Sequence, residues 1–357
     1  MAHYEERLEA DLSEIRTRVI RAASHVEEAL RNAERTLRAG DRELASATIL
    51  GDHRINRETR EIDALCHSFV ARHLPSAGHL RFVSAVMRVS IELERIGDYA
   101  ATVCREAVQL SAPPPTSIAN DIELMAEQGR TMLAQSIQAF HDGNAELARG
   151  TAGMARQARA LTQRLWSDLE REGERESRPV SDLFAILLIL NRLERVSDQA
   201  KNICEETIFA ATGETKAPKA YSILFVDETN AGLSQIAEAT ARKSFPESGR
   251  YASAGWAPAA QIDADVQAFL ADNSLDYDGA APRGLGDLGR TVSDFDIIVG
   301  VGCDPRPHLD EVPFHSTVVT WSLAVDSVGA PTLNEALKSL SLETRSLMET
   351  LHGPGAG

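Results

Sequence analysis

Two copies of one short motif place pairs of carboxylates in equivalent settings 100 residues apart. The segments LERIGDYA and LERVSDQA share five of eight positions, and each contains a Glu and an Asp four residues apart. These pairs are Glu94 with Asp98 and Glu194 with Asp198. Side chains four residues apart lie on one face of a helix, so each pair can direct its oxygens toward a shared point. Paired carboxylates of this kind suit a hard cation.

The helical row through the second motif is richer in oxygen donors than the row through the first. The second row consists of Asn191, Glu194, Asp198, Asn202 and Glu205. The first row contains Ile91 and Thr102 beside its carboxylate pair, but one face of the preceding segment adds Asp52, Asn56 and Asp63. The corresponding positions in the second copy are Ala155, Arg159 and Trp166. We therefore expect two unequal sites, the second the stronger, and oxygen donors alone favour Mg, Mn, Fe or Ca over softer metals.

A simpler interpretation of the motifs competes with metal binding. An ExxxD pair is common on the exposed face of a helix, and an arginine, Arg95 or Arg195, stands beside each pair. A solvated charged face would explain a single copy. Duplication in register weighs against it, because an ordinary surface has no reason to keep Glu, Arg and Asp while the residues between them change. A metal-binding protein and a helical oligomer without metal both stay open.

The first 212 residues have the pattern of helices. Long stretches rich in Ala, Leu, Glu and Arg are interrupted only by short segments containing Pro, Gly or clustered polar residues. GDRELA, beginning at Gly40, is echoed by GNAELA, beginning at Gly143. The pattern predicts six helices in two three-helix bundles, residues 1–112 and 113–212.

The pattern changes after a short linker, residues 213–220. Buried-strand runs at residues 221–226 and 295–301 alternate with helical segments. Further elements are a strand-like piece ending at Gly255, a strand at 317–323, and helices at 263–272 and 333–351. This alternation predicts an α/β domain, residues 221–357, with a parallel sheet in a three-layer arrangement and ligands at the carboxyl ends of the strands. The fold class is therefore multidomain, all-α followed by α/β.

Composition narrows the classes of partner. The 357 residues carry a formal net charge of −16, which repels phosphate backbones and argues against nucleic-acid binding. The longest wholly apolar run, residues 183–190, is much shorter than the roughly 20 residues that a membrane span requires. No basic leader precedes an apolar segment. We expect a cytoplasmic protein with four reduced cysteines that reaches a membrane only through protein partners.

The helical region resembles the PhoU family of phosphate-signalling accessory proteins. The similarity is carried by residues 73–103, including Leu80 and Arg81 before the first motif, and by residues 187–206. It implies a homo-oligomer, a homodimer in its simplest form, whose ExxxD motifs hold multinuclear metal clusters. It also implies partners, a phosphate ABC-transporter ATPase and a sensor histidine kinase, through which the phosphate-starvation response and its transcription are repressed.

The resemblance and the helical rows together give a candidate ligand set for Fe, Mn, Mg or Zn. The motif residues carried over from the family are Glu94, Asp98, Glu194 and Asp198. The rows add Asp52, Asn202 and Glu205. The second copy lacks an acidic partner in its fifth helix, which leaves its cluster incomplete.

The C-terminal region is similar to low-molecular-weight phosphatases and the arsenate reductases of the same fold. The similarity is carried by residues 223–239, SAGW at 253–256, and residues 295–304 with Trp321 downstream. In that family a Cys follows the first strand and attacks phosphorus or arsenic, and an Arg six residues later binds the oxyanion.

The residues on which that chemistry depends are replaced in this chain. Asp227 stands at the Cys position and Leu233 at the Arg position, while Asn230 and Ser234 persist. Cys303 matches a reductase cysteine but lacks its resolving partner. We expect no enzyme but a regulatory adaptor with a pseudo-phosphatase domain. The alternative is an arsenate reductase or phosphatase with altered chemistry, for which Asp227, directly after a buried strand, would be one candidate nucleophile.

Overall fold

The chain divides into two compact units, Met1–Lys216 and Ala217–Gly357. The computed structural model describes residues 2–175, 178–216, 219–275, 280–289, 291–309, 316–323 and 332–354. The first unit is helical and the second contains a parallel sheet flanked by helices. The fold class predicted from the sequence is thereby confirmed.

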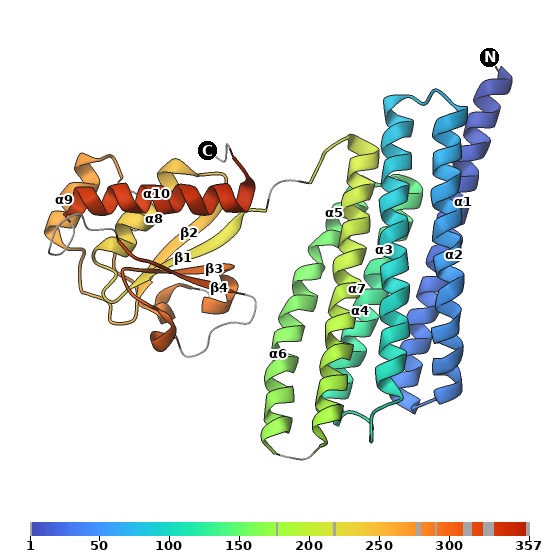
Figure 1. Ribbon diagram of the computed structural model, residues 1–357, viewed down its shortest axis with the longest axis horizontal. Helices are drawn as coiled ribbons and strands as arrows, with labels where there is room; N and C mark the ends of the chain where they lie inside the picture. Colours follow the sequence, from blue (N-terminus) through green and yellow to red (C-terminus); the bar gives the residue numbers. More distant parts are fainter. Residues whose placement is uncertain are drawn as a thin grey trace. The chain divides into compact units, whose positions relative to one another are not determined.

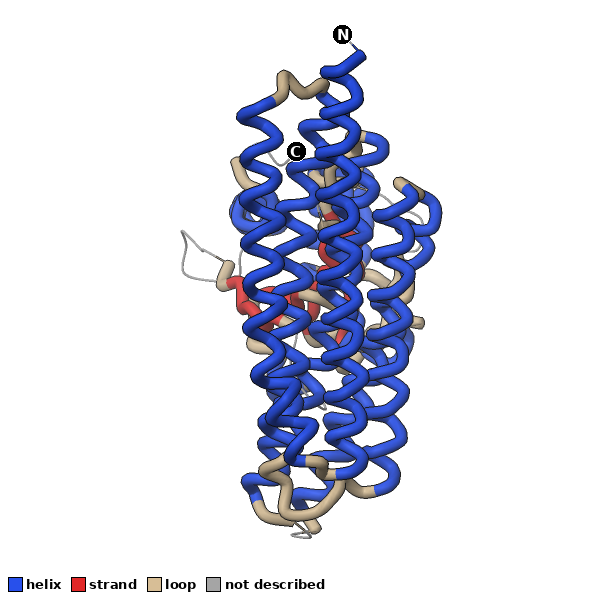
Figure 2. Tube along the Cα trace, turned by 90° about the vertical axis from the view of Figure 1, so that its right-hand side faces the viewer, coloured by secondary structure: helices blue, strands red, loops and turns tan. Residues whose placement is uncertain are grey.

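The helices of the first unit run side by side (Figures 1 and 2). They are α1 (Ala2–Ala39), α2 (Arg42–Arg72), α3 (Ala77–Ala107), α4 (Thr116–Asp142), α5 (Ala145–Gly153), α6 (Ala155–Glu174) and α7 (Val180–Thr212). One apolar core contains residues from α1, α2, α3, α4, α6 and α7. Helices α3 and α7 pack against each other, and each also packs against other helices of its own repeat. The two predicted three-helix sets therefore share a core instead of each enclosing its own.

The fifth of the six predicted helices is broken in two. Helix α5 ends at Gly153 and α6 begins at Ala155, so the described part of this unit contains seven helices. The Met154 amide donates to the Thr151 carbonyl at 3.0 Å, a contact three residues back that interrupts the regular pattern. Gly150 and Gly153 weaken the helix there, since each glycine costs about 1 kcal/mol relative to alanine.

The repeated GDRELA and GNAELA segments form the same turn. Gly40 and Gly143 adopt left-handed backbone conformations, with φ of 64° and 62°, in the turns that follow α1 and α4. The next residues, Asp41 and Asn144, cap α2 and α5 by accepting a hydrogen bond from the amide three positions later, at 2.9 and 3.0 Å. The repeated sequence therefore forms the same turn twice, in which the glycine ends one helix and the next residue caps the following helix.

The second unit is built on a four-stranded parallel sheet in the order β2-β1-β3-β4. The strands are β1 (Tyr221–Asp227), β2 (Gly249–Gly255), β3 (Ile297–Val301) and β4 (Thr317–Trp321). The helices are α8 (Leu233–Ser244), α9 (Ala264–Asp272) and α10 (Leu333–His352), with short 3-10 turns η1 (Leu285–Asp287), η2 (Val292–Asp294) and η3 (Arg306–His308). Side chains of α8, α9 and α10 share a core with one face of the sheet, and the segments around η1 and η2 pack on the other.

The strand order places the carboxyl end of β1 at the centre of the unit. Strand β1 lies between β2 and β3, and its last residue, Asp227, is in register with Gly255 at the end of β2. In parallel α/β sheets, the point where the chain leaves for opposite sides of a strand forms the ligand-binding crevice. Asp227 therefore occupies the position from which such a unit would contact a ligand.

Candidate functional site

The first candidate site is a carboxylate cluster where α2 and α3 pack closely. Asp52 of α2 is only 7% exposed. A Cβ atom added at Gly97 of α3 would lie 3.2 Å from Asp52 Oδ1 and 3.0 Å from Ile55 Cδ1. Glycine at position 97 therefore lets the two helices approach at the level of the first motif.

Two oxygens of this cluster lack hydrogen-bond partners. Asn56 Nδ2 donates to Asp52 Oδ2 at 3.0 Å. The other oxygens, Asp52 Oδ1 and Asn56 Oδ1, are buried and have no hydrogen-bond partner among the described residues. Burying an unsatisfied acceptor costs about 1–3 kcal/mol. Carboxylate and amide oxygens left in this state are the donors that a hard cation would satisfy.

Like charges add to the strain on this cluster. The pKa of Asp52 is raised above its usual range by burial and then by Asp98. The pKa of Glu94 is raised by burial, then by Asp98 and Asp52. Nearby Arg95 opposes these effects on Glu94 without cancelling them. Asp98 is exposed, so solvent and ions can reach the cluster on that side. A bound cation would relieve this repulsion.

The second row, on α7, has cationic partners instead. Asp198 lies 3.6 Å from the Arg195 guanidinium. The Glu205 carboxylate is 2.7 Å from Lys216 Nζ and 3.6 Å from Lys201 Nζ. These contacts offset negative charge that a metal would otherwise neutralise. They do not support the expectation that this oxygen-rich row is the stronger site.

Asn202 of the second row is engaged in a hydrogen bond with a neighbouring amide side chain. Asn202 Nδ2 donates to Gln199 Oε1 at 3.2 Å, and Gln199 Nε2 donates to the Tyr99 hydroxyl at 3.3 Å. These contacts connect α7 to α3, the third helix of the first repeat. Asn202 therefore takes part in packing between the repeats.

The described residues contain no group of three or more His, Cys, Asp or Glu side chains placed to hold a metal ion as they stand. Asp52, Glu94 and Asp98 interact electrostatically but do not converge on one point. Asp63, which the sequence placed on the same face of α2, contacts His67 at 3.5 Å. A cation would have to draw the side chains of α2 and α3 together, with Asn56 as an additional neutral donor.

The second candidate site is the loop from β1 to α8. Asp227 Oδ1 accepts a hydrogen bond from the Asn230 amide at 2.6 Å, and Oδ2 accepts from the Ser234 amide at 2.9 Å. Ser234 is the second residue of α8, whose amino-terminal end carries positive partial charge. Amides arranged in this way normally attract an external anion. Here the chain's own carboxylate occupies them.

The surrounding contacts hold the loop in this conformation. Asn230 is fully buried with a left-handed φ of 51°, and its Nδ2 donates to Ser234 Oγ at 2.9 Å. Its Oδ1 accepts from the Arg283 amide at 2.8 Å and from Gln235 Nε2 at 3.1 Å. Gly255 lies so close that an added Cβ would be 2.6 Å from the Glu228 carbonyl oxygen. The loop is therefore tightly packed around the Asp227 carboxylate.

The residues expected for thiol chemistry are unsuited to it. The apolar Leu233 side chain lies beside Gly302, where an added Cβ atom would be 3.8 Å from Leu233 Cδ1, and it offers no positive charge to an oxyanion. Burial, followed by Asp227 and Asp304, raises the pKa of the Cys303 thiol. A raised pKa keeps this thiol protonated at neutral pH, and the protonated form is a poor nucleophile.

Comparison with known proteins agrees with the geometry of the helical unit. The family model described as "PhoU domain" matches residues 19–107 and 122–207. A phosphate-specific transport system accessory protein PhoU homolog from Pseudomonas putida is 29% identical over 213 residues, 59% of this chain and 83% of that protein. The crystal structure of PhoU from Pseudomonas aeruginosa matches with a TM-score of 0.56 and 29% identity, covering 58% of this chain and 99% of that one. The helical unit is therefore built of two PhoU domains.

The α/β unit has a weaker structural likeness. A thioredoxin-dependent arsenate reductase from Corynebacterium glutamicum is 23% identical, with a TM-score of 0.31, over 42% of this chain and 75% of that one. So distant a match says nothing about activity. Among the described residues no helix is both long and apolar enough to cross a membrane.

Sequence reasoning overlooked two parts of these sites. Gly97 is replaced by Ser197 in the second motif, yet it sets the spacing between α2 and α3. A glycine inside a long helical pattern is the signal that could have revealed it. The second omission is that Asp227 binds the amides of its own loop. An Asp directly before a turn is a common acceptor for amides of that turn, which could have suggested this contact.

Proposed function

We propose that this chain is a regulatory accessory protein of phosphate transport, acting as a cytoplasmic adaptor. The observation that carries the proposal is the pair of PhoU domains in the helical unit. The relatives that match these domains are named as accessory proteins of the phosphate-specific transport system. By this proposal the helical unit, as a homo-oligomer, contacts a transporter ATPase and a sensor histidine kinase and represses the phosphate-starvation response.

A metal is part of the proposal, and the first cluster fits it better than the second. Asp52, Glu94 and Asp98, with Asn56, offer only oxygen donors, and two of their oxygens are buried without partners. These donors suit a divalent or multinuclear centre of Mg, Mn, Fe or Zn. Such a centre would supply positive charge that joins α2 to α3. Glu194 and Asp198 would take part only if their present partners were displaced.

The α/β unit serves the proposed adaptor as a domain without catalysis. An enzyme of this fold needs a nucleophile after β1 and open amides for the oxyanion. In this chain Asp227 occupies two of those amides, and Leu233 provides no positive charge. The alternative, an arsenate reductase or phosphatase, is therefore not favoured.

A deletion and complementation experiment tests the regulatory role. A reporter of phosphate-starvation transcription would be measured in the source cells with the gene deleted, and again with the full chain restored. We expect the reporter to be active in phosphate-rich medium after deletion and silent after restoration. The tagged chain should also co-purify with a phosphate-transporter ATPase or a sensor kinase. An unchanged reporter together with neither partner would contradict the proposal.

A turnover assay tests the absence of catalysis. The full chain should show no hydrolysis of an aryl phosphate and no arsenate reduction above background. The matched variant is Asp227→Ala, made at the residue that would have to act as nucleophile. Wild-type turnover that this variant abolishes would place the protein among enzymes.

A further inference from the structure

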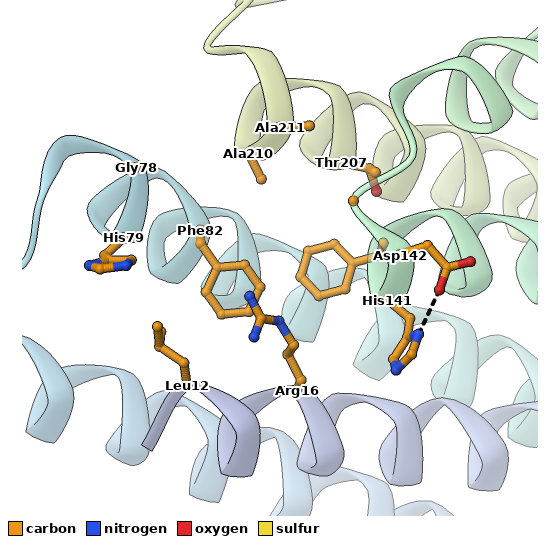
Figure 3. A pocket seen from close by; sticks show the side chains of 12 residues that line it. Leu12, Arg16, Gly78, His79, Phe82, His141, Asp142, Thr207, Ala210 and Ala211 are labelled. Carbon is orange, nitrogen blue, oxygen red and sulfur yellow. Dashed lines mark hydrogen bonds and ion pairs between the residues drawn. The ribbon is translucent and has the colours of Figure 1, made fainter. Parts of the chain in front are cut away.

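A pocket of about 480 Å³ opens in the helical unit (Figure 3). Its lining includes no residue of either ExxxD motif. Its walls come from α1, the first turns of α3, and the last turns of α4 and α7. The volume falls in the range of small-molecule sites, about 300–1,000 Å³. Neither the metal proposal nor the adaptor role accounts for this pocket.

Arg16 of α1 faces the pocket, and no carboxylate of the described residues pairs with it. Its guanidinium lies 4.6 Å from the centroid of the Phe82 ring. Among the residues that the structure describes, it makes no ion pair and no hydrogen bond. Two residues further along, Arg18 contacts Glu61 at 3.0 Å and Glu14 at 3.4 Å. In a chain with a net charge of −16, an arginine that stays unpaired beside a cavity is available to an anion.

Other groups with positive character line the same side. Gly78 and His79 belong to the first turn of α3, where the helix end carries positive partial charge. His79 Nδ1 is buried and has no hydrogen-bond partner in the part of the chain that the structure describes. On the far side, His141 Nδ1 lies 2.8 Å from Asp142, the one carboxylate among the residues that line the pocket. The lining is therefore positive at Arg16 and carries its carboxylate, Asp142, on the opposite side.

Aromatic and aliphatic side chains form the rest of the wall. The Phe82 and Phe140 rings are stacked, with centroids 5.7 Å apart and an interplanar angle of 18°. Leu12 is buried beneath the floor, and Ala210 and Ala211 in the last turn of α7 add accessible apolar surface. Inorganic phosphate would leave this surface in contact with water. An anion that also carries an apolar group would cover it.

We propose that this pocket binds a small organic phosphate, a phosphate monoester with a compact apolar body. The phosphate oxygens would accept hydrogen bonds from the planar guanidinium of Arg16, which presents two parallel donors to such a group. The apolar body would lie against Phe82 and the last turn of α7, Ala210 and Ala211, which are the less buried apolar residues of the lining. The inference stands apart from the metal cluster, and failure of either leaves the other intact.

Calorimetry on the full chain tests this proposal with phenyl phosphate as the probe. We expect saturable binding by the wild type, and a loss of about tenfold or more in affinity for Arg16→Ala, on the scale of one charge-assisted contact. Arg18→Ala is the matched control because that arginine lies on the same helix but already has two carboxylate partners. It should bind as the wild type does. Circular dichroism would show that both variants keep their helices.

Two further probes separate the halves of the site. Inorganic phosphate should bind more weakly than phenyl phosphate, and benzyl alcohol, which has the ring but no charge, should not bind detectably. Absence of saturable phenyl phosphate binding by the wild type would overturn the proposal. Equal losses in the Arg16 and Arg18 variants, or equal affinity for inorganic and phenyl phosphate, would overturn it as well.

Discussion

The two ExxxD motifs differ less in their own residues than in the groups around them. In the first, Glu94 and Asp98 lie near buried Asp52, and the pKa values of Asp52 and Glu94 are raised. In the second, Asp198 has Arg195 within 3.6 Å, and further along the same row Glu205 has Lys216 within 2.7 Å. In the first cluster burial and like charges outweigh the nearby arginines, whereas carboxylates of the second row contact cationic side chains directly.

The difference teaches that the neighbouring helix decides what the motif can do. In the first repeat α2 is continuous and places Asp52 against Gly97. In the second repeat the corresponding segment is divided into α5 and α6, and Ala155 stands where Asp52 stands in the first. A duplicated motif does not by itself make a duplicated site.

The largest expected effect comes from forcing α2 and α3 apart. Gly97→Leu would insert a side chain where even a Cβ atom lies 3.0 Å from Ile55 Cδ1. Overpacking of this kind typically costs about 1–3 kcal/mol in the free energy of unfolding. The control is Ser197→Ala at the equivalent position, where the buried hydroxyl has no partner and its removal should be neutral or stabilising. Urea unfolding of both variants would check this, and equal losses would remove the distinction between the repeats.

A smaller effect of opposite sign is expected when charge is removed from the first cluster. Asp52→Asn should raise the free energy of unfolding of the metal-free protein by up to about 1 kcal/mol, the scale of a partly solvated charge pair. Asp198→Asn should lower it slightly, because that residue loses its contact with Arg195. Thermal unfolding in the presence of a chelator measures both. Destabilisation by Asp52→Asn greater than that by Asp198→Asn would contradict the repulsion.

The same repulsion predicts a dependence on pH. The pKa values of Asp52 and Glu94 are raised in the folded protein, so the native state binds more protons than the unfolded state in the window above their ordinary values. Their contribution to stability is therefore favourable at low pH and is lost as pH rises through the raised values. In the Asp52→Asn variant, unfolding free energies measured across pH 4 to 7 should fall less steeply with rising pH. An identical slope in the variant and the wild type would show that Asp52 does not titrate in this way.

The smallest effect is expected at the exposed cations of the second row. Lys216→Ala removes the shorter of the two contacts to Glu205, and such a surface pair contributes about 0–1 kcal/mol. The substitution is more informative for cation binding, because we expect the variant to gain affinity for a divalent ion at this row relative to the wild type. Manganese titration followed by paramagnetic broadening near α7 would detect the gain. No change would mean that Lys216 does not limit metal binding there.

The sequence predicted the elements better than their junctions. The helical pattern, the parallel sheet and the identity of the loop after β1 are all present as predicted, because periodicity and strand composition act locally. The break at Met154 was not predicted, because two glycines within one helical turn weaken a helix but do not by themselves indicate that it ends there. The shared core was also missed, because the packing of α3 on α7 depends on contacts between distant residues.

For the candidate sites, residue types were predictable but partners were not. By its number of oxygen donors the second row was the better predicted metal site, because Asn202 and Glu205 extend it. The count could not include Lys216, which follows the end of α7 and reaches back to Glu205 in the folded chain. Nor could it show that Asp52 Oδ1 is left without a partner. Charge balance is a property of the packed structure and outweighs the number of donors.

The most direct test of the central claim is metal content measured on two matched double variants. Wild type, Asp52→Asn with Glu94→Gln, and Glu194→Gln with Asp198→Asn would be dialysed against the same manganese concentration and analysed for bound metal. We predict that the first pair of substitutions removes the metal. The variant then also loses the stabilisation that metal binding gives the wild type, about 2.7 kcal/mol at a metal concentration a hundredfold above Kd. The second pair should leave most of the metal in place. Greater loss in the second double variant, or no metal in the wild type, would contradict the account.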